Sequence, residues 1–302
     1  MHILVAAAGA VGAVIASFLQ DRHDVYLIAR GAQLSAVREN GLRVIFPEGD
    51  SIIEPGENIS DNPQGWGQMD LVILAVKSYS TDHMLDFIAP CVGPETKILS
   101  VQNGIGNEDK IAEKYGLAKT IGGRIIIGAE LLEPGVVQCY NFDGIVLGPW
   151  DVSPPSSLEN LVEELSTQGM SVRLSEDIRW VKWRKLLWNA AFNPITAITK
   201  RTVEEVLADP DGRELAITLL EETRAVAEAM GYKMPEDVVE KSMQYSDVYR
   251  GFKTSMQQDV KFGRKLEYEA ITGEIIRAAR EKGVDVPANE AVYATLRMMS
   301  GD

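Results

Sequence analysis

The sequence is poor in cysteine and histidine and has no long hydrophobic run. Its two cysteines, Cys91 and Cys139, provide no disulfide framework and no metal-ligand spacing, so we expect a reducing, cytoplasmic location. The three histidines are scattered along the chain, and we expect no metal site. No run of roughly 18 apolar residues is available to cross a bilayer, so membrane association is not expected.

Positive charge is also scarce. The 30 Lys and Arg residues are outnumbered by 44 Asp and Glu residues, and the net charge of −14 argues against binding to nucleic acid or to an anionic membrane. A small anionic substrate remains compatible, because a local group of Lys, Asn and backbone N–H donors outweighs distant surface charge. The 45% of hydrophobic residues and the length of 302 residues predict a globular protein of two domains.

The first 19 residues, MHILVAAAGAVGAVIASFL, are apolar and at first sight resemble a signal peptide. They lack the basic segment with which such peptides begin, and their glycines have the spacing of a phosphate-binding turn. We therefore interpret them as a strand, a turn and a helix.

The first half alternates short apolar runs with helix-like segments. The apolar runs are typical of parallel strands buried on both faces and occupy residues 2–7, 24–29, 70–76 and 96–102. The helix-like segments occupy residues 10–20, 32–40, 79–89 and 107–115. This alternation predicts βαβ units in a doubly wound, Rossmann-like α/β domain. Further elements are expected as strands at 120–128, 136–149 and 170–174, a hairpin turn at Asp143-Gly144 and a helix at 156–169.

The composition changes near residue 175. From Asp177 onward nearly every segment has helical composition, interrupted by Gly and Pro. We therefore predict an α/β domain over residues 1–174, with a parallel-strand core, followed by an all-α domain over residues 175–302.

The first strand leads into a turn that is similar to the dinucleotide fingerprint Gly-x-Gly-x-x-Gly. Gly9 and Gly12 fill its second and third glycine positions, whereas Ala7 stands at the first. An alanine there costs little if its φ is negative and about 1–2 kcal/mol if it is positive. The alternative is a strand and helix whose glycines serve packing alone. The residues expected to hold a pyrophosphate are Ala7, Ala8, Gly9, Ala10, Val11 and Gly12.

Arg30 follows the second strand, where an NAD-specific fold usually carries Asp or Glu. A carboxylate would repel a 2′-phosphate, whereas a guanidinium binds it with two parallel hydrogen bonds. Arg30 therefore favours NADP(H) over NAD(H). The alternative, a solvated arginine at a strand end, does not explain the absence of the acid.

Lys77 and Asn103 follow the next two strands. Ligands in such sheets bind beyond the carboxyl ends of the strands, so we expect both side chains near the cofactor. A surface lysine and an ordinary Asn-Gly turn are the alternatives.

A row of polar side chains lies within an apolar helical segment after residue 177. Lys185, Asn189 and Asn193 are spaced by four residues and so share one helix face. Pro194 predicts a disturbed helix at Asn193 that leaves backbone groups available to a ligand. Reduction of a ketone needs a proton donor, which Lys185 would supply, while the asparagines would bind the polar groups of the substrate. The alternative is a long amphipathic helix with a solvated lysine.

Together and in this order, these features resemble the ketopantoate reductase (2-dehydropantoate 2-reductase) family along the whole chain. The pattern is a glycine turn, a second-strand Arg, a Val-Lys, an Asn-Gly, a Trp-x-Lys-Leu helix with Asn and Asn-Pro, and a late Ser-Ser-Met-x-x-Asp…Glu stretch, in which Thr254 stands here for the first Ser. After the glycine turn it is carried here by Arg30, Val76-Lys77, Asn103-Gly104, Trp183-Arg184-Lys185-Leu186, Asn189, Asn193-Pro194, Ser255-Met256, Asp259 and Glu267.

The resemblance implies an NADP-dependent oxidoreductase acting on CH-OH groups, which reduces ketopantoate, a small 2-oxo acid, to (R)-pantoate on the route to pantothenate and coenzyme A. It implies that Lys185 is the general acid and that Asn103 touches both cofactor and substrate. The further residues that it implies are Lys77, Ala129 and Glu267 for the cofactor, and Asn189, Asn193 and Ser255 for the substrate.

The departures from the family pattern concentrate on the substrate side. Ile127 stands where the family often shows His, and residues 200–203 lack the Asn that many members place there. Two other interpretations therefore stay open: a related NADPH-dependent reductase of another 2-oxo acid, and an NADP-binding sensor without turnover. The sequence is silent on the oligomeric state and allows a homodimer.

Overall fold

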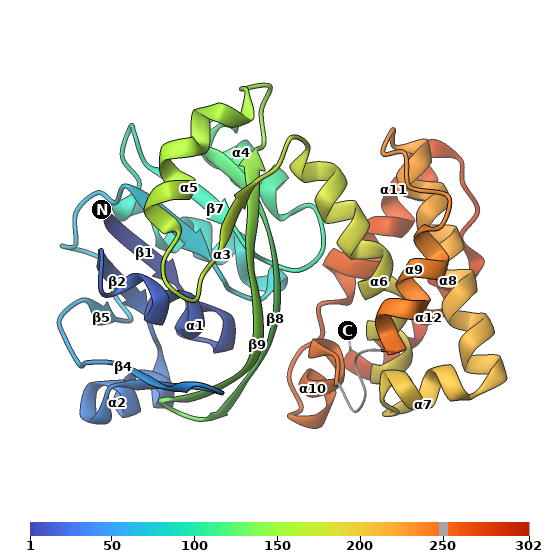
Figure 1. Cartoon of the computed structure of the whole chain (residues 1–302), viewed down its shortest axis with the longest axis horizontal. Coiled ribbons are helices and arrows are strands. Elements are labelled where there is room, and N and C mark those ends of the chain that lie inside the picture. The colour runs from blue at the N-terminus through green and yellow to red at the C-terminus, as the bar shows by residue number, and fades with distance from the viewer. Residues whose placement is uncertain (248–252, 302) are drawn as a thin grey trace. The chain divides into compact units, whose positions relative to one another are not determined.

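The computed structural model describes residues 1–247 and 253–301 (Figure 1). Its internal contacts divide the chain into two compact units. Unit 1 comprises Met1–Gln102 and Asn107–Ile178, and unit 2 comprises Asn103–Gly106 and Arg179–Asp302. The short segment Asn103–Gly106 thus belongs to the second unit although it lies early in the sequence. Residues 248–252 and 302 of the predicted helical domain lie outside the described residues.

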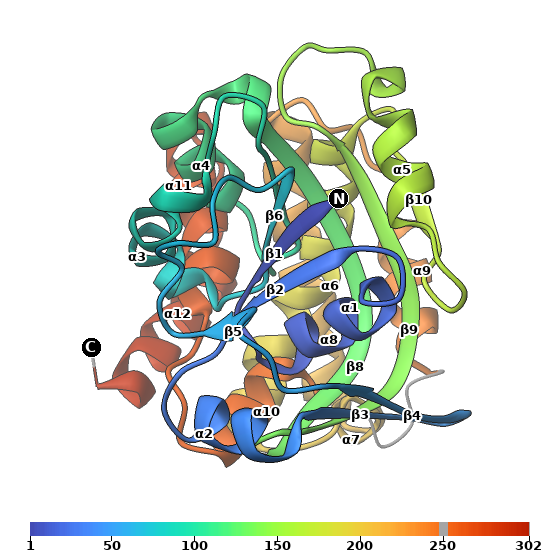
Figure 2. The same ribbon diagram turned by 90° about the vertical axis from the view of Figure 1, so that its left-hand side faces the viewer.

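Unit 1 is built on one sheet with the strand order β4-β3-β9-β8-β7-β6-β1-β2-β5, and β10 pairs with β9 (Figure 2). Its strands are β1 His2–Ala6, β2 Asp24–Ile28, β3 Leu42–Phe46, β4 Gly49–Ile53, β5 Ile59–Ser60, β6 Leu71–Leu74, β7 Lys97–Ser100, β8 Thr120–Glu133, β9 Val136–Pro149 and β10 Val172–Leu174. Parallel pairing joins β8, β7, β6, β1, β2 and β5 in that order, as the alternating sequence predicts.

Helices cover both faces of this sheet. Ile3 and Val5 of β1 pack with α1 (Ala10–Leu19) on one face, whereas Leu4 and Ala6 pack on the other face with residues of α3 (Thr81–Phe87) and α4 (Asn107–Tyr115). The remaining helical segments are α2 Gly31–Asn40, α5 Glu159–Leu165 and the short turns η1 Ser78–Ser80, η2 Ala89–Cys91, η3 Leu117–Lys119 and η4 Pro155–Leu158. Burial on both faces explains the near-continuous apolar strands. The predicted Rossmann-like fold is confirmed.

One predicted turn is wrong. Asp143-Gly144 does not connect two strands but lies inside β9, and β8 and β9 are joined instead at Pro134-Gly135. The antiparallel register shifts between Ile125 and Ile127, opposite this dipeptide, which marks a β-bulge. Gly144 has φ +80°, and a Cβ there would lie 2.1 Å from the carbonyl oxygen of Ser171. The glycine is therefore required by a bulge, which a sequence does not distinguish from a hairpin turn.

The described part of unit 2 is helical, in agreement with the prediction (Figure 1). Its helices are α6 Ile178–Thr199, α7 Val203–Ala208, α8 Pro210–Ala229, α9 Val238–Asp247, α10 Ser255–Lys261, the π-helical turn η5 Glu269–Gly273, α11 Glu274–Lys282 and α12 Pro287–Ser300. Local signals fix several boundaries: Thr202 and Glu205 form a capping box before α7, and Asp209 caps α8. None of the described helices is both long enough and apolar enough to cross a lipid bilayer.

The expected disturbance at Pro194 is wrong, because α6 continues through this residue to Thr199. Proline removes one N–H from the helix, but the helix is held by its surroundings. Leu187, Ala190 and Phe192 are fully buried in the core of unit 2. The hydroxyl of Thr196 donates to the carbonyl of Phe192 at 2.7 Å, a contact within the helix on the far side of the proline. Packing therefore overrides the local effect of the proline.

Candidate functional site

The turn after β1 has the backbone of a glycine turn even where it lacks glycine. Ala7 has φ +123°, a conformation that L-residues rarely adopt. Its N–H donates to the carbonyl of Val5 at 3.1 Å, and the N–H of Ala8 donates to Ile28 of the neighbouring strand at 2.8 Å. Ala7 therefore adopts the strained backbone conformation with positive φ, and these two hydrogen bonds hold it there.

The two glycines of the turn meet different surroundings. A Cβ on Gly12 would lie 1.9 Å from the carbonyl oxygen of Ala7, so strand and helix approach each other too closely for any side chain. No protein atom lies within 4 Å of the corresponding position on Gly9. The turn is therefore closed at Gly12 and open at Gly9, which is the arrangement that a bound pyrophosphate requires.

Helix α1 begins directly after Gly9 and supplies donors. The N–H groups at the start of a helix have no acceptor within that helix, and Gly9 as the preceding residue offers no side-chain cap. These N–H groups, together with the helix dipole, favour an anion at this end.

Arg30 directly precedes α2, and its guanidinium is held by two aromatic groups from α3. It lies 4.4 Å from the ring centroid of Phe87, and its Nη1 lies 3.2 Å from Nε2 of His83. Both contacts lie within unit 1. The exposed guanidinium is thus oriented by neighbours that bring no negative charge, which leaves its own charge available to a phosphate.

A buried polar network fixes the carboxyl ends of β6 and β7. The side-chain amide of Gln102 donates to the carbonyl of Val76 at 3.0 Å and to the hydroxyl of Thr81 at 2.8 Å. Thr81 in turn donates to Oδ1 of Asn107 at 3.0 Å. Lys77 follows Val76 and is half-buried. Sequence reasoning gave Gln102, Thr81 and Asn107 no role; the available signal was that Gln102 ends an expected strand, whereas Thr81 and Asn107 begin α3 and α4.

The sheet topology brings several expected cofactor residues to one edge. Strands β6, β1 and β2 are parallel neighbours, so Lys77, the turn Ala7–Gly12 and Arg30 all follow carboxyl ends at the same edge. Ala129 lies in β8 and is half-buried.

In unit 2 the structure brings Lys185 and Asn103 together. The ammonium of Lys185 donates to Oδ1 of Asn103 at 2.7 Å, although 82 positions separate them. Asn189 and Asn193, one and two turns further along α6, are 6% and 2% exposed. The polar row predicted from spacing is therefore largely buried, and Lys185 itself is half-buried rather than solvated.

The remaining expected residues of unit 2 lie on other elements. Ser255 is the half-buried first residue of α10. The preceding Thr254 pairs with Thr196 of α6 at 2.7 Å, so the start of α10 is tied to the helix that carries Lys185. Glu267 is 6% exposed and precedes the π-helical turn. The charged residues around Glu267 in the sequence favour a solvated side chain. In the structure its carboxylate is buried instead.

Both halves of the chain match models of the same protein family. Residues 3–152 match the family model described as ketopantoate reductase PanE/ApbA, and residues 177–300 match its C-terminal counterpart. A 2-dehydropantoate 2-reductase of Pyrococcus horikoshii is 32% identical over 98% of this chain and 97% of its own length. One from Mesorhizobium japonicum is 30% identical over 99% and 98%, respectively.

Solved structures agree with these matches. A 2-dehydropantoate 2-reductase from Geobacter metallireducens superposes with a TM-score of 0.94 at 29% identity, covering 99% of this chain and all of its own. A D-mandelate dehydrogenase solved with NADH and anilino(oxo)acetate has a TM-score of 0.91 at 23% identity, covering 100% of this chain and 98% of its own. At that identity the second likeness concerns the fold alone.

Proposed function

Because the chain belongs to the ketopantoate reductase family, and is thus an NAD(P)-dependent oxidoreductase acting on CH-OH groups, we propose that it uses NADPH to reduce ketopantoate to (R)-pantoate. This step would serve pantothenate and coenzyme A biosynthesis. The observation that carries the proposal is the hydrogen bond from Lys185 to Asn103, which links a lysine on a largely buried polar helix face to a residue three positions after the end of β7.

The turn Ala7–Gly12 fits a dinucleotide, since Gly12 excludes a side chain, Gly9 leaves space and α1 presents its N–H groups. Arg30 would bind the 2′-phosphate bidentately, with His83 and Phe87 holding the guanidinium, and this supports NADPH over NADH. Lys77, Ala129 and Glu267 would complete the cofactor site, Glu267 near a ribose. When bound, NADPH supplies the hydride that reduces the carbonyl carbon.

In this proposal Lys185 is the proton donor. Reduction places negative charge on the ketone oxygen, and an ammonium held in a half-buried position transfers its proton to that oxygen as the charge develops. Asn103 orients the ammonium by accepting one of its three N–H bonds at 2.7 Å. Lys185 is then a neutral amine, which regains a proton from water before the next turnover.

The asparagines would bind the substrate without burying additional charge. Asn189 and Asn193 are nearly inaccessible, and buried amides need hydrogen-bond partners. Their amide groups can donate to a carboxylate or accept from a hydroxyl, and Ser255 at the start of α10 would supply a further hydroxyl. A 2-oxo acid with a hydroxyl group presents both kinds of partner.

A different 2-oxo acid is the second candidate substrate, favoured by the segment after α6. Lys200 has φ +60°, and Gln257 donates to its carbonyl at 2.9 Å and to that of Arg201 at 3.0 Å. These contacts hold the backbone at Lys200 and Arg201, in the segment 200–203 that lacks the asparagine of many family members. The cofactor chemistry would be unchanged while the substrate side differs.

The test is NADPH oxidation followed at 340 nm with a panel of 2-oxo acids that includes ketopantoate. Turnover of ketopantoate with the highest kcat/KM supports the first candidate, and a higher value for another acid supports the second. Tight binding of NADPH with no turnover of any acid would contradict both.

A further inference from the structure

We propose that Arg277 is a positioning residue for the reduction, which acts through Asn103. The inference rests on the proposed function, in which Asn103 orients Lys185. Arg277 lies in α11 and touches neither of these residues in any contact that we describe. Its influence would pass through the π-helical turn Glu269–Gly273 and the segment Asn103–Gly106, both of which belong to unit 2.

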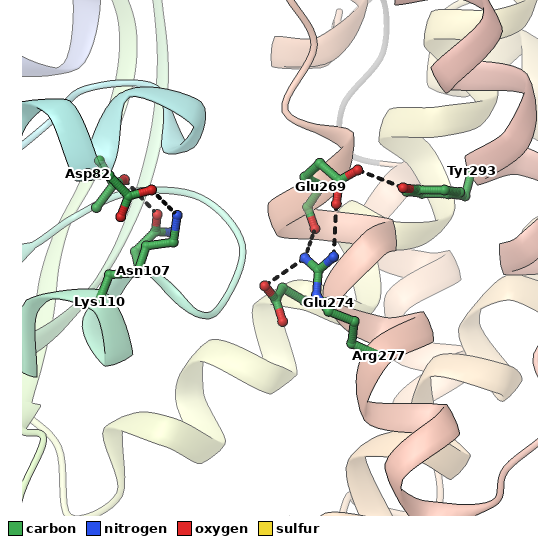
Figure 3. Close-up of polar contacts among 8 residues, drawn as sticks. Asp82, Asn107, Lys110, Glu269, Glu274, Arg277 and Tyr293 are labelled. Atoms are coloured by element: carbon green, nitrogen blue, oxygen red, sulfur yellow. Dashed lines mark hydrogen bonds and ion pairs between the residues drawn. The ribbon is translucent and has the colours of Figure 1, made fainter. Parts of the chain in front are cut away.

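Arg277 binds two groups of Glu269, in the π-helical turn before α11, and one of Glu274, at the start of α11 (Figure 3). Its Nη1 donates to a carboxylate oxygen of Glu269 at 2.9 Å, and its Nη2 donates to the carbonyl of Glu269 at 3.1 Å and to Oε1 of Glu274 at 2.7 Å. Tyr293 of α12 donates to the other oxygen of Glu269 at 2.6 Å. Glu269, the first residue of the π-helical turn, is therefore held both by its side chain and by its backbone.

The same turn anchors the segment that carries Asn103. The N–H of Ile105 donates to the carbonyl of Ala270, the residue after Glu269, at 3.0 Å. The contact is too close for a side chain, since a Cβ on Gly104 would lie 2.0 Å from that carbonyl oxygen. On Gly106 a Cβ would lie 2.9 Å from Oε1 of Glu274, the second carboxylate that Arg277 binds.

A continuous set of contacts thus runs from Arg277 to the proposed proton donor. Arg277 fixes Glu269, the Ala270 carbonyl next to it holds Ile105, and Asn103 two residues earlier accepts from Lys185. Turns of π-helix are rare and tend to occur at functional sites. Here a carbonyl of the π-helical turn, that of Ala270, accepts from the N–H of Ile105 in the Asn103 segment.

The chemistry of arginine suits this role. One planar guanidinium reaches two carboxylates and a carbonyl at once, which an ammonium cannot reproduce. Its hydrogen bonds to Glu274 and Glu269 raise the pKa of Arg277, so the group stays charged. Because Arg277 is half-exposed, the ion pairs contribute little to global stability. We therefore expect its loss to affect turnover more than melting temperature.

The experiment is a double-mutant cycle between Arg277→Lys and Asn103→Ala. Arg277→Lys keeps the charge between the two carboxylates, so the protein is expected to fold. In the wild-type background it should lower kcat by about tenfold, because misplacement of a catalytic group by less than an ångström has such effects. With Asn103→Ala already present, it should change kcat by less than about twofold, because the route to Lys185 is already cut. Tyr293→Phe should show the same pattern with a smaller loss.

Arg280→Lys is the matched control, because Arg280 lies one turn further along α11 and pairs with Glu290 on the surface. It should leave kcat within about twofold in both backgrounds. An undiminished Arg277→Lys effect in the Asn103→Ala background, or no effect of Arg277→Lys and Tyr293→Phe on kcat, would overturn the positioning role. Full activity of Asn103→Ala would instead overturn the proposed function on which the inference rests.

Discussion

The carbonyl oxygen of Ala7 occupies the space that a side chain on Gly12 would need, only 1.9 Å from the position of its Cβ. Gly9, three residues earlier, has no protein atom within 4 Å of the same position. The two glycines of one turn therefore have separable roles. Gly12 allows strand and helix to pack, and Gly9 leaves an open approach to the helix N-terminus.

Substitution of each glycine by alanine separates these roles. Gly9→Ala should leave the melting temperature within a few degrees of wild type and weaken NADPH binding by about tenfold, because the methyl group enters the approach to the pyrophosphate. Gly12→Ala should lower both stability and affinity, because the backbone must move. Calorimetry and fluorescence titration measure the two quantities. Unchanged NADPH affinity in Gly9→Ala would contradict the binding role of the turn.

Ala7→Gly should stabilise the protein. The φ of +123° strains alanine by about 1–2 kcal/mol, and glycine relieves this strain while adding entropy to the unfolded chain, for a net gain of up to about 1 kcal/mol. Urea unfolding measures the difference. Ala8→Gly, at a residue without positive φ, is the control and should be neutral or destabilising. A loss of stability in Ala7→Gly would show that the turn holds alanine without strain.

Arg30→Asp should discriminate between the two nicotinamide cofactors. The substitution replaces the proposed ligand of the 2′-phosphate by a group that repels it, so NADPH should bind at least about 100-fold more weakly. NADH lacks this phosphate, and its Kd should change by no more than about threefold. Isothermal titration with both cofactors provides the measurement. Equal weakening of both would argue that Arg30 acts on the fold rather than on the phosphate.

The two cysteines should be inert in the folded protein. Burial raises the pKa of Cys91 and of Cys139 from 9.0 to about 11, so at pH 8 only about one thiol in a thousand is ionised. Iodoacetamide should therefore label neither residue at pH 8, and both after unfolding in urea. Because the unfolded chain releases these protons first, the free energy of unfolding should fall as the pH rises from about 9 to about 11. Rapid labelling of the native protein would contradict their burial.

Much of the fold could be predicted because the apolar runs in the sequence are the segments that become buried strands. The strands at 2–7 and 70–76 are apolar throughout because helices cover both sheet faces. Where one local signal serves two structures, prediction failed: Asp143-Gly144 is suited to a hairpin turn and to a bulge alike. Pro194 is a third kind of case, in which buried neighbours such as Phe192 maintain a helix that the local sequence disfavours.

The candidate site was predictable only in part for a related reason. Spacing of four residues placed Lys185, Asn189 and Asn193 on one helix face, because helix geometry is periodic. No such rule connects Lys185 with Asn103, or Arg277 with Glu269 and the segment that Ala270 holds. Those contacts depend on how distant segments pack, and in the sequence Arg277 is one charge among many on an exposed helix face.

The most direct test of the account is the turnover of Lys185→Ala with NADPH and the best 2-oxo acid of the panel. Loss of the proton donor should lower kcat by about 10²–10⁴-fold, while the Kd for NADPH should stay within about threefold of wild type, because the proposed phosphate ligands are untouched. A kcat within tenfold of wild type, at unchanged NADPH affinity, would contradict the assignment of Lys185 as the general acid.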